Sequence, residues 1–494
     1  MYESLLPDLL ATAPILLVAA LGVVVVLVDA FRNDSPSIPW IAGIGMAVAL
    51  VLELLAIGRP ATAFEGQVIT GGVSAFANVV ILLGTTGSLV ISVPYLRRIG
   101  HHYGEVHALI LIGTAGMMTL ASAGSLVTLF VGLETMSVCL YVLTGLVRSG
   151  ARANESALKY FLLGAFSTGF LLYGLALLYG ATGTMSFDLM APALATTGRT
   201  GFFLAGVALL LIGFFFKISA VPFHMWTPDV YQGAPTTLTA YMATASKTAA
   251  FVALAVVLSR ALPEVFVGGV VQLALAAVAA VTMVFGNVAA LRQANVKRML
   301  AYSSVAHAGY LLAGLAAGTA AGYSGALFYL LAYTVMNVGA FGVIAALEWD
   351  EKQGAVQTLD SLAGIGYRRP LLGVAMGVFM FALAGFPPLA GFIGKYLVFS
   401  AAVNAGLTWL AIVGVLTSVV SAFYYLRVLV VFWMKDPAEA APEARMAAFP
   451  VGTPTLAVLG VCVLAIIGLG VLFGGVVDVT QALFAAPLST AVLP

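Results

Sequence analysis

The sequence predicts an all-α polytopic membrane protein with about fourteen membrane-spanning helices. Hydrophobic residues make up 62% of its 494 residues and charged residues only 8%. That composition leaves too little polar surface for a soluble globule of this size. Apolar runs of roughly 20 residues, the length of a helix that crosses a hydrocarbon core, recur along the chain. We therefore expect the whole chain to lie in a bilayer.

The expected spans follow one another through mostly short loops, with no linker long enough to separate soluble domains. They lie near residues 8–29, 39–57, 75–94, 105–122, 125–147, 156–180, 200–219, 236–260, 265–291, 299–319, 322–347, 370–402, 408–434 and 452–475. Tyr2, Glu3 and Asp8 precede the first run, where a cleaved signal peptide would carry basic residues. We therefore expect the first helix to be retained.

Basic residues gather in alternate loops. The odd-numbered loops hold Arg32, Arg97, Arg98, Arg148, Arg152, Arg292, Lys297, Arg298, Lys352, Arg368, Arg369, Lys435 and Arg445. The even-numbered loops hold only Arg59, Arg199 and Arg260. Because positive charge collects in short cytoplasmic loops, we expect the odd loops in the cytoplasm and both termini on the outer side.

The composition gives no sign of a bound cofactor or of a nucleic-acid partner. The net charge is +1, and its sided distribution forms no nucleic-acid-binding patch. Cys139 and Cys462 both fall inside apolar segments, which favours small buried hydrophobes over a disulfide. An iron–sulfur cluster needs about four cysteines, and no glycine-rich stretch follows a strand in a dinucleotide-binding context. We expect this chain to hold no redox centre.

Ionisable residues inside the spans are the informative ones, because each costs a few kcal/mol in a helix centre and normally faces the bundle interior or a water path. Glu134 lies near the middle of the fifth span. Ser137, Tyr141, Thr144 and Arg148 follow it at helical spacing and form one polar stripe. We expect this carboxylate to face inward. The alternative is a structural ion pair or hydrogen-bond anchor.

Two lysines occupy the sixth and eighth spans. Glu155 and Lys159 are four residues apart, the spacing of a helical ion pair, which can also be only local support. Lys159 gains importance if its helix packs beside the glutamate of the fifth span. Lys247 lies well inside the eighth span, and Thr237 and Thr244 share its helix face. Snorkelling to the interface is the alternative for a membrane lysine, but a mid-span position disfavours it.

A weaker polar stripe follows in the tenth and eleventh spans. Ser303, His307 and Tyr310 align on one helix face, and Asn337 with Tyr333 marks a similar point in the next span. A buried histidine of this kind is either a proton carrier or a satisfied core donor. The sequence leaves both interpretations open.

Two apolar runs are interrupted beside a lysine. In GFFFKISAVPFHMWTPDVYQGAP, Lys217 precedes a break that contains Pro222, and in FALAGFPPLAGFIGKYLVFS, Lys395 follows a break at Pro387 and Pro388. Proline frees backbone carbonyls inside the membrane, which is tolerated only where protein or a water-filled cavity satisfies them. Interrupted helices at corresponding places in two halves point to a transport site.

The spacing of these features predicts an internal repeat. There are 173 residues from Glu134 to His307 and 178 from Lys217 to Lys395, and each step advances five spans. Because five is odd, helices 4–8 and 9–13 would be inverted copies, with helices 7 and 12 broken. The expected units are residues 1–100 (helices 1–3), 101–262 (first repeat), 263–436 (second repeat) and 437–494 (a loop and helix 14).

Buried lysines near a carboxylate suit proton transfer. Burial penalises the charged amine and a neighbouring carboxylate favours it, so a small rearrangement can make the amine gain or lose a proton. Moving a proton against ~180 mV requires about 4 kcal/mol. That energy corresponds to a change of about 3 in the pKa of the amine, which is within the range that burial and pairing can produce.

The motifs resemble one known family across essentially the whole chain. FFFKISAVPFHMWTPDVYQGAPT, ALKYFLLGAFSTG, NVKRMLAYSSVAHAGY and GFPPLAGFIGKYLVF resemble the N-type antiporter-like membrane subunits of bacterial proton-pumping NADH:quinone oxidoreductase, respiratory complex I. The sister L-type subunits are longer and carry a lateral C-terminal helix. The M-type subunits carry a glutamate at the position of Lys395.

The resemblance implies roles for the residues at matching positions. Glu134 would modulate charge in helix 5, and Lys159 would lie between it and the pump centre. Lys217 would bind the proton, Lys247 would connect the halves, and Lys395 would pass protons outward. A polar or water-organising role is expected for His224, with supporting positions at His307, Tyr310 and Asn337.

The resemblance also implies a setting and leaves two alternatives. The partners would be a neighbouring antiporter-like subunit and small membrane-arm subunits in the bacterial inner membrane. NADH, FMN, iron–sulfur clusters and quinone would be used on or near other subunits. The alternatives are an Mrp-type cation/proton antiporter subunit, and a structural membrane scaffold whose buried charges only fix helix register.

Overall fold

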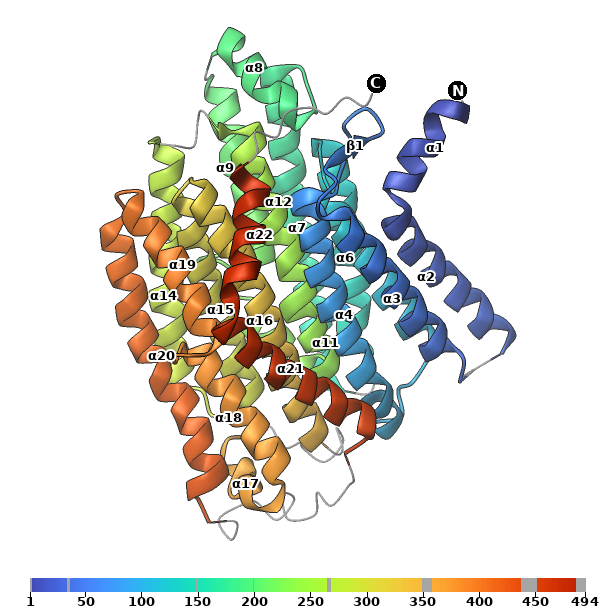
Figure 1. Cartoon of the computed structure of the whole chain (residues 1–494), viewed down its shortest axis with the longest axis vertical. Coiled ribbons are helices and arrows are strands. Elements are labelled where there is room, and N and C mark those ends of the chain that lie inside the picture. The colour runs from blue at the N-terminus through green and yellow to red at the C-terminus, as the bar shows by residue number, and fades with distance from the viewer. Residues whose placement is uncertain are drawn as a thin grey trace.

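The computed structural model describes residues 2–32, 36–147, 150–198, 200–263, 268–348, 358–436 and 451–485. Within them the chain is a bundle of long helices (Figure 1). Thirteen of these helices are long and apolar enough to cross a membrane. The all-α polytopic fold predicted from the sequence is confirmed.

The N-terminal quarter contains four helices and a small hairpin. The helices are α1 (Tyr2–Ala11), α2 (Ala13–Phe31), α3 (Ile38–Ala56) and α4 (Gly72–Arg98). Strands β1 (Ala61–Ala63) and β2 (Val68–Thr70) pair antiparallel between α3 and α4. The predicted first span begins too early, because α1 ends at Ala11 and the long helix α2 starts at Ala13.

The middle of the chain supplies the broken seventh helix and the buried eighth. Its elements are α5 (Gly104–Ala121), α6 (Leu126–Thr144), α7 (Ala151–Thr182), α8 (Phe187–Thr197), α9 (Gly201–Ile218), α10 (Thr227–Gly233), α11 (Thr236–Tyr241) and α12 (Lys247–Val256). The π-helical turns η1 (Met242–Ser246) and η2 (Val257–Ala261) join α11 and α12 into one span, Thr236–Ala261. Such π turns are frequent at functional sites, and Lys247 directly follows the first.

The second half also contains long helices and one broken pair. Its elements are α14 (Val270–Leu291), α15 (Val296–Ala316), α16 (Ala320–Leu347), the 3₁₀ turn η3 (Asp360–Leu362), α17 (Ile365–Arg368), α18 (Pro370–Ala384), α19 (Ala390–Asn404), α20 (Thr408–Met434), α21 (Thr453–Val471) and α22 (Phe473–Ala485). The expected span 370–402 is the pair α18 and α19. The sequence prediction missed α8 and α22.

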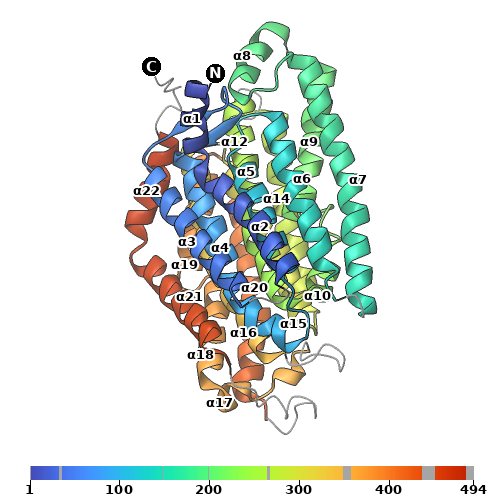
Figure 2. The ribbon, with the colours of Figure 1, turned by 90° about the vertical axis from the view of Figure 1, so that its right-hand side faces the viewer.

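The centre of the bundle is formed by three spans. In α15 and in the span Thr236–Ala261, 94% of the most apolar window is buried, and in α16 89%, against 22% in α2 and 28% in α21. Figure 2 shows α7 along one edge of the molecule and α21 with α22 along the opposite edge. Polar side chains on the three central helices are therefore shielded from lipid.

The ends of the bundle are distinct. Helices α1, α8 and α22 reach one end, and α17 lies at the other (Figures 1 and 2). The two ends of the described chain thus lie on the same side of the bundle. The assignment of that side to the outer face of the membrane remains a prediction from the loop charges.

The first break lies between α9 and α10, and side-chain hydrogen bonds connect the two sides of it. Ser219 takes a left-handed conformation with φ 65°. The indole Nε1 of Trp226 donates to the Phe216 carbonyl at 2.9 Å, and the Thr227 hydroxyl donates to Ser219 Oγ at 2.7 Å. The Phe216 carbonyl, which also accepts from the Ser219 backbone N–H at 3.2 Å, is thus satisfied by protein, as the membrane interior requires.

The second break lies between α18 and α19. Gly385 caps α18 with φ 91°, a conformation in which a side chain would be strained. A β-carbon on Gly391 would lie 1.8 Å from the Ala382 carbonyl oxygen, so only glycine permits this approach. The ammonium of Lys395 donates to the Ala384 carbonyl at 2.8 Å. Here the lysine itself satisfies the interrupted helix.

Candidate functional site

Lys217 lies at the end of α9, inside the bundle. Its side chain is buried, with 6% of the residue exposed. Its Nζ donates to Ser137 Oγ at 2.7 Å and to the Tyr141 hydroxyl at 3.3 Å, both on α6. The same Nζ lies 5.4 Å from the centre of the Tyr141 ring and 5.6 Å from that of Phe216. The predicted polar stripe of α6 is therefore the face that holds this amine.

Glu134 lies one helical turn before Ser137 on the same helix. Its Oε1 accepts a hydrogen bond from the Thr168 hydroxyl of α7 at 2.7 Å, and the residue is half-buried. Three residues along a helix place two side chains on one face. The carboxylate therefore shares the α6 face that holds the Lys217 amine, and its hydrogen bond comes from Thr168 and not from Lys217.

Lys159 is placed differently from the expectation. Its Nζ contacts Glu155 at 2.6 Å and Asp229 of α10 at 2.8 Å. Thr168, which contacts Glu134, lies nine residues further along α7, about 14 Å at 1.5 Å per residue. α7 does pack beside α6, but Lys159 joins the segment after the break and not the glutamate.

Asp229 holds α10 between the two halves of the chain. Besides Lys159, it accepts a hydrogen bond from Arg298 Nη1 of α15 at 2.6 Å. Arg298 also donates to Gln232 at 3.2 Å. Sequence reasoning did not select Asp229, because its acidic side chain follows a proline break where a solvated turn is the ordinary interpretation.

Lys247 lies at the centre of the bundle, with 1% of the residue exposed. Its Nζ donates to the backbone carbonyl of Ser304 on α15 at 2.7 Å. The Ser304 hydroxyl accepts from Tyr333 of α16 at 2.8 Å and lies 3.5 Å from the Tyr231 hydroxyl of α10. The snorkelling alternative is excluded for Lys247 in this conformation, because its amine points into the core.

Asn337 supports this centre from α16. Its Nδ2 donates to the Tyr333 carbonyl one turn away at 2.9 Å. Its Oδ1 is buried and has no hydrogen-bond partner among the described residues. Buried polar atoms normally find a partner, so this oxygen is an acceptor that remains available.

His307 continues the line along α15. Its Nδ1 lies 2.7 Å from the Tyr329 hydroxyl and its Nε2 lies 3.0 Å from the Tyr425 hydroxyl. Tyr425 also shares a short hydrogen bond with Ser303. Both ring nitrogens are engaged, which fits a core hydrogen-bond hub and also a relay between two hydroxyls.

Lys395 ends the line in the second broken helix. Besides bonding Ala384, its Nζ lies 4.9 Å from the centre of the Tyr310 ring. The Tyr310 hydroxyl accepts from Asn287 Nδ2 at 2.9 Å, and Asn287 Oδ1 accepts from Tyr424 at 3.0 Å. Tyr310 is thus fixed beneath the lysine by groups from α14 and α20.

His224 stands apart from this line. It is half-buried in the first break, its ring packs edge-on against Phe285 at 4.5 Å between centroids, and its Nδ1 has no hydrogen-bond partner among the described residues. The structure does not bring it into contact with Lys217. Its predicted polar role stays a prediction.

The buried groups form an interrupted series across the bundle. Its described members are Glu134, Ser137, Tyr141, Lys217, Lys247, Ser304, Tyr333, His307, Tyr329, Tyr425, Tyr310 and Lys395. Amines, hydroxyls and an imidazole can pass protons to one another where side chains or waters bridge the gaps between them. Among the described residues no three His, Cys, Asp or Glu side chains gather to hold a metal ion.

Comparisons with known proteins give one consistent result. A model of the NADH:quinone oxidoreductase/Mrp antiporter transmembrane family matches residues 123–421. The chain is 58% identical to the NADH-quinone oxidoreductase subunit N of Salinibacter ruber, over 98% of this chain and 97% of that protein. A chain from the structure of respiratory complex I from Thermus thermophilus with bound aureothin matches at TM-score 0.79 and 37% identity, over 94% of this chain and 98% of that chain.

A second solved structure shares the fold alone. A chain of the Mrp complex from Dietzia sp. matches at TM-score 0.85 and 20% identity, over 98% of both chains. At that identity the likeness extends to the arrangement of helices and carries no statement about activity.

Proposed function

Because the chain belongs to the subunit N family of NADH-quinone oxidoreductases, we propose that it translocates protons as a membrane-arm subunit of respiratory complex I. Quinone reduction on other subunits drives the movement. The observation that carries this proposal is the series of lysines at the two breaks and between them, each bonded inside the bundle. Buried amines of this kind mark proton and ion pathways in membrane proteins.

The geometry supports a division of roles. Lys217 binds the transported proton, because Ser137 and Tyr141 offer acceptors to its charged form. Lys247 connects the two halves through Ser304, and Lys395 passes the proton outward from the second break. Release from each amine follows when its acceptors move, since the dry surroundings penalise the charged form.

Glu134 regulates the proton affinity of Lys217. Redox events elsewhere in the complex change the charge or position of this carboxylate, which alters the proton affinity of Lys217 from the adjacent turn of α6. Lys159 acts on the other side of the break: its ion pair with Asp229 holds α10, the segment that follows Lys217. Charge changes at Lys159 would therefore reach the break through α10.

The two halves are proposed to be inverted copies, helices 4–8 and 9–13 in the numbering of the expected spans. Their breaks, α9 to α10 and α18 to α19, each have a lysine beside them, before the first break and after the second. Two inverted half-paths that open to opposite sides would follow from this arrangement.

The setting follows from the family. We place the chain in the bacterial inner membrane, with both termini outside, beside another antiporter-like subunit and small membrane subunits. NADH, FMN, iron–sulfur clusters and quinone would be used by other subunits. Copurification of the chain with flavin and iron–sulfur subunits tests this assignment.

An Mrp-type cation/proton antiporter is the second candidate, because the family model that matches residues 123–421 includes Mrp antiporters as well as NADH:quinone oxidoreductases. A sodium-dependent proton flux through the purified chain alone would support the antiporter and contradict the complex I assignment. A structural scaffold is the third candidate. Normal pumping by an assembled complex with Glu134, Lys217, Lys247 and Lys395 all neutralised would support the scaffold.

A further inference from the structure

A buried charge pair lies outside the series from Glu134 to Lys395, at the end of the bundle where α4 and α16 end and α15 begins. Glu348 follows α16 with 3% of the residue exposed, and Lys297 on α15 has 2% exposed. Lys297 Nζ lies 3.9 Å from Glu348 Oε1. Removing two charges from water is costly, so the position of this pair calls for a physical reason.

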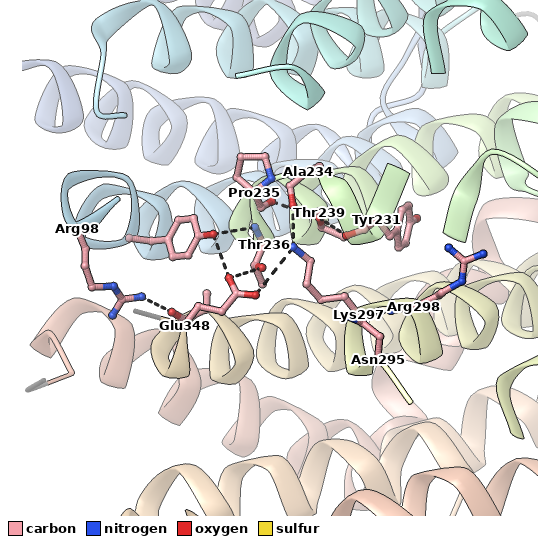
Figure 3. A network of polar contacts seen from close by, with 12 residues as sticks. Arg98, Tyr231, Ala234, Pro235, Thr236, Thr239, Asn295, Lys297, Arg298 and Glu348 are labelled. Carbon is pink, nitrogen blue, oxygen red and sulfur yellow. Dashed lines mark hydrogen bonds and ion pairs between the residues drawn. The ribbon is translucent and has the colours of Figure 1, made fainter. Parts of the chain in front are cut away.

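Lys297 and Glu348 both form hydrogen bonds with the junction between α10 and α11 (Figure 3). Lys297 Nζ donates to the Ala234 carbonyl at 2.8 Å, and the Thr236 hydroxyl donates to Glu348 Oε2 at 2.6 Å. Ala234 and Thr236 flank Pro235, which separates the broken seventh helix from the span that carries Lys247.

A cavity of about 270 Å³ lies beside Tyr95, one of the residues that contact Glu348. It lies between α4, α16 and α21 and is lined by Tyr95, Arg98, Ala345 and Thr455, among others. The Tyr95 hydroxyl donates to Glu348 Oε2 at 3.0 Å. Tyr95 therefore lines the cavity and bonds the carboxylate at the same time.

Two basic side chains, Arg98 and Lys297, lie near Glu348. Arg98 donates to the carbonyl of Ala345, three residues before Glu348, and Lys297 faces Oε1. Glu348 Oε1 itself is buried without a hydrogen-bond partner among the described residues. Oε2 thus accepts from Tyr95, which lines the cavity, and Oε1 is the oxygen that faces Lys297.

Polar residues lie between the Lys297–Glu348 pair and Lys247. Lys297 and Ser304 are seven residues apart on α15, two turns or about 10 Å on one face, and Ser304 accepts from Lys247. On α16, Asn337 precedes Glu348 by eleven residues, three turns on one face. Its free Oδ1 and the unpartnered hydroxyl of Thr237, next to Thr236, are buried acceptors.

We propose that Glu348 is the carboxylate that takes up protons for this chain, from the cavity through Tyr95, and that Lys297 is its charge partner between uptake events. The Tyr95 hydroxyl gives its proton to Oε2 and regains one from the cavity side. Protonation neutralises the partner of Lys297 and loosens its hold on the α10–α11 junction. The basic loops at this end place it in the cytoplasm, where a pump that moves protons outward takes them up.

This inference rests on the proposed function, and the assembled complex tests both. Protons pumped per NADH oxidised are measured in vesicles for the double variant Glu348→Gln/Lys297→Met, with Lys217→Ala as the reference for lost transport through this chain. Glu348→Asp keeps the carboxylate. Asp360→Asn, which removes one partner of an exposed ion pair with Lys435, is the control for charge loss at the same end.

A merely structural pair and an uptake site predict opposite results. Removing both charges of a structural pair leaves no unpaired buried charge and should preserve pumping. We expect the double variant to assemble and to pump as few protons per NADH oxidised as Lys217→Ala does. Glu348→Asp and Asp360→Asn should pump as many protons per NADH as the wild type. A wild-type ratio in the assembled double variant, beside a lowered ratio in Lys217→Ala, overturns this inference alone.

The remaining outcomes are also decisive. If Lys217→Ala pumps normally in an assembled complex, the proposed function fails. If the double variant does not assemble, Tyr95→Phe, which removes only a hydroxyl, takes its place. We expect it to lower the ratio, and an unchanged ratio in that variant overturns the route through Tyr95.

Discussion

Replacing Ser137 with alanine perturbs Lys217 with the smallest possible change. The ammonium loses its 2.7 Å acceptor and keeps the Tyr141 hydroxyl at 3.3 Å. A hydrogen bond to a charged group contributes about 1.5–3 kcal/mol. Because Lys217 is almost fully buried, bulk solvent offers no replacement acceptor. The balance between protonated and neutral amine therefore shifts toward the neutral form by about 10-fold to 160-fold.

The assay is proton pumping at fixed NADH oxidation by the assembled complex. We expect Ser137→Ala to lower the pumping rate by about 10-fold or more for protons that depend on Lys217, with normal assembly. Ser137→Thr is the matched control, because it keeps the hydroxyl that bonds both Lys217 and the Leu133 carbonyl. Equal pumping by the alanine, threonine and wild-type complexes would refute the role assigned to this contact.

Three further substitutions separate structural from transport roles. Trp226→Phe removes one of two donors to the Phe216 carbonyl, since the Ser219 N–H remains, and should lower the stability of the complex by about 0.5–1.5 kcal/mol; an unchanged inactivation temperature would show that the break does not depend on the indole. Tyr425→Phe removes one hydroxyl partner of His307, and slower pumping in an assembled complex supports a relay, whereas an unchanged rate makes this histidine a core hub. Asp229→Asn breaks two partly exposed ion pairs of α10 and should cost no more than about 1 kcal/mol for each, measured as a small fall in inactivation temperature; failed assembly would contradict that estimate.

The membrane fold and the lysines at the breaks were predictable, because both rest on local composition. A charge inside an apolar run and prolines beside it are visible without knowledge of the tertiary structure. Lys217 and Lys395 therefore lie where the sequence places them, next to the ends of α9 and α18.

The partners of these residues were not predictable, because they come from helices distant in the chain. Tyr425 reaches His307 across 118 residues, and no pattern in its own span marks it. Lys159 shows the same limit. Its spacing from Glu155 predicts the local pair, but its contact with Asp229 depends on how α10 folds back after the break.

Glu348 marks a further limit. In the sequence it lies in a hydrophilic stretch where solvated charge is the simplest interpretation, and only the fold buries it against Thr236 and Lys297. A charge at the end of a span is therefore ambiguous until the packing around that end is known.

The most direct test of the central claim is the number of protons pumped per NADH oxidised by an assembled complex that carries Lys217→Ala. This substitution removes the amine that Ser137 and Tyr141 hold in the first break. The account predicts full assembly, continued quinone reduction and a lower proton ratio than wild type. An unchanged ratio in a fully assembled complex would contradict it.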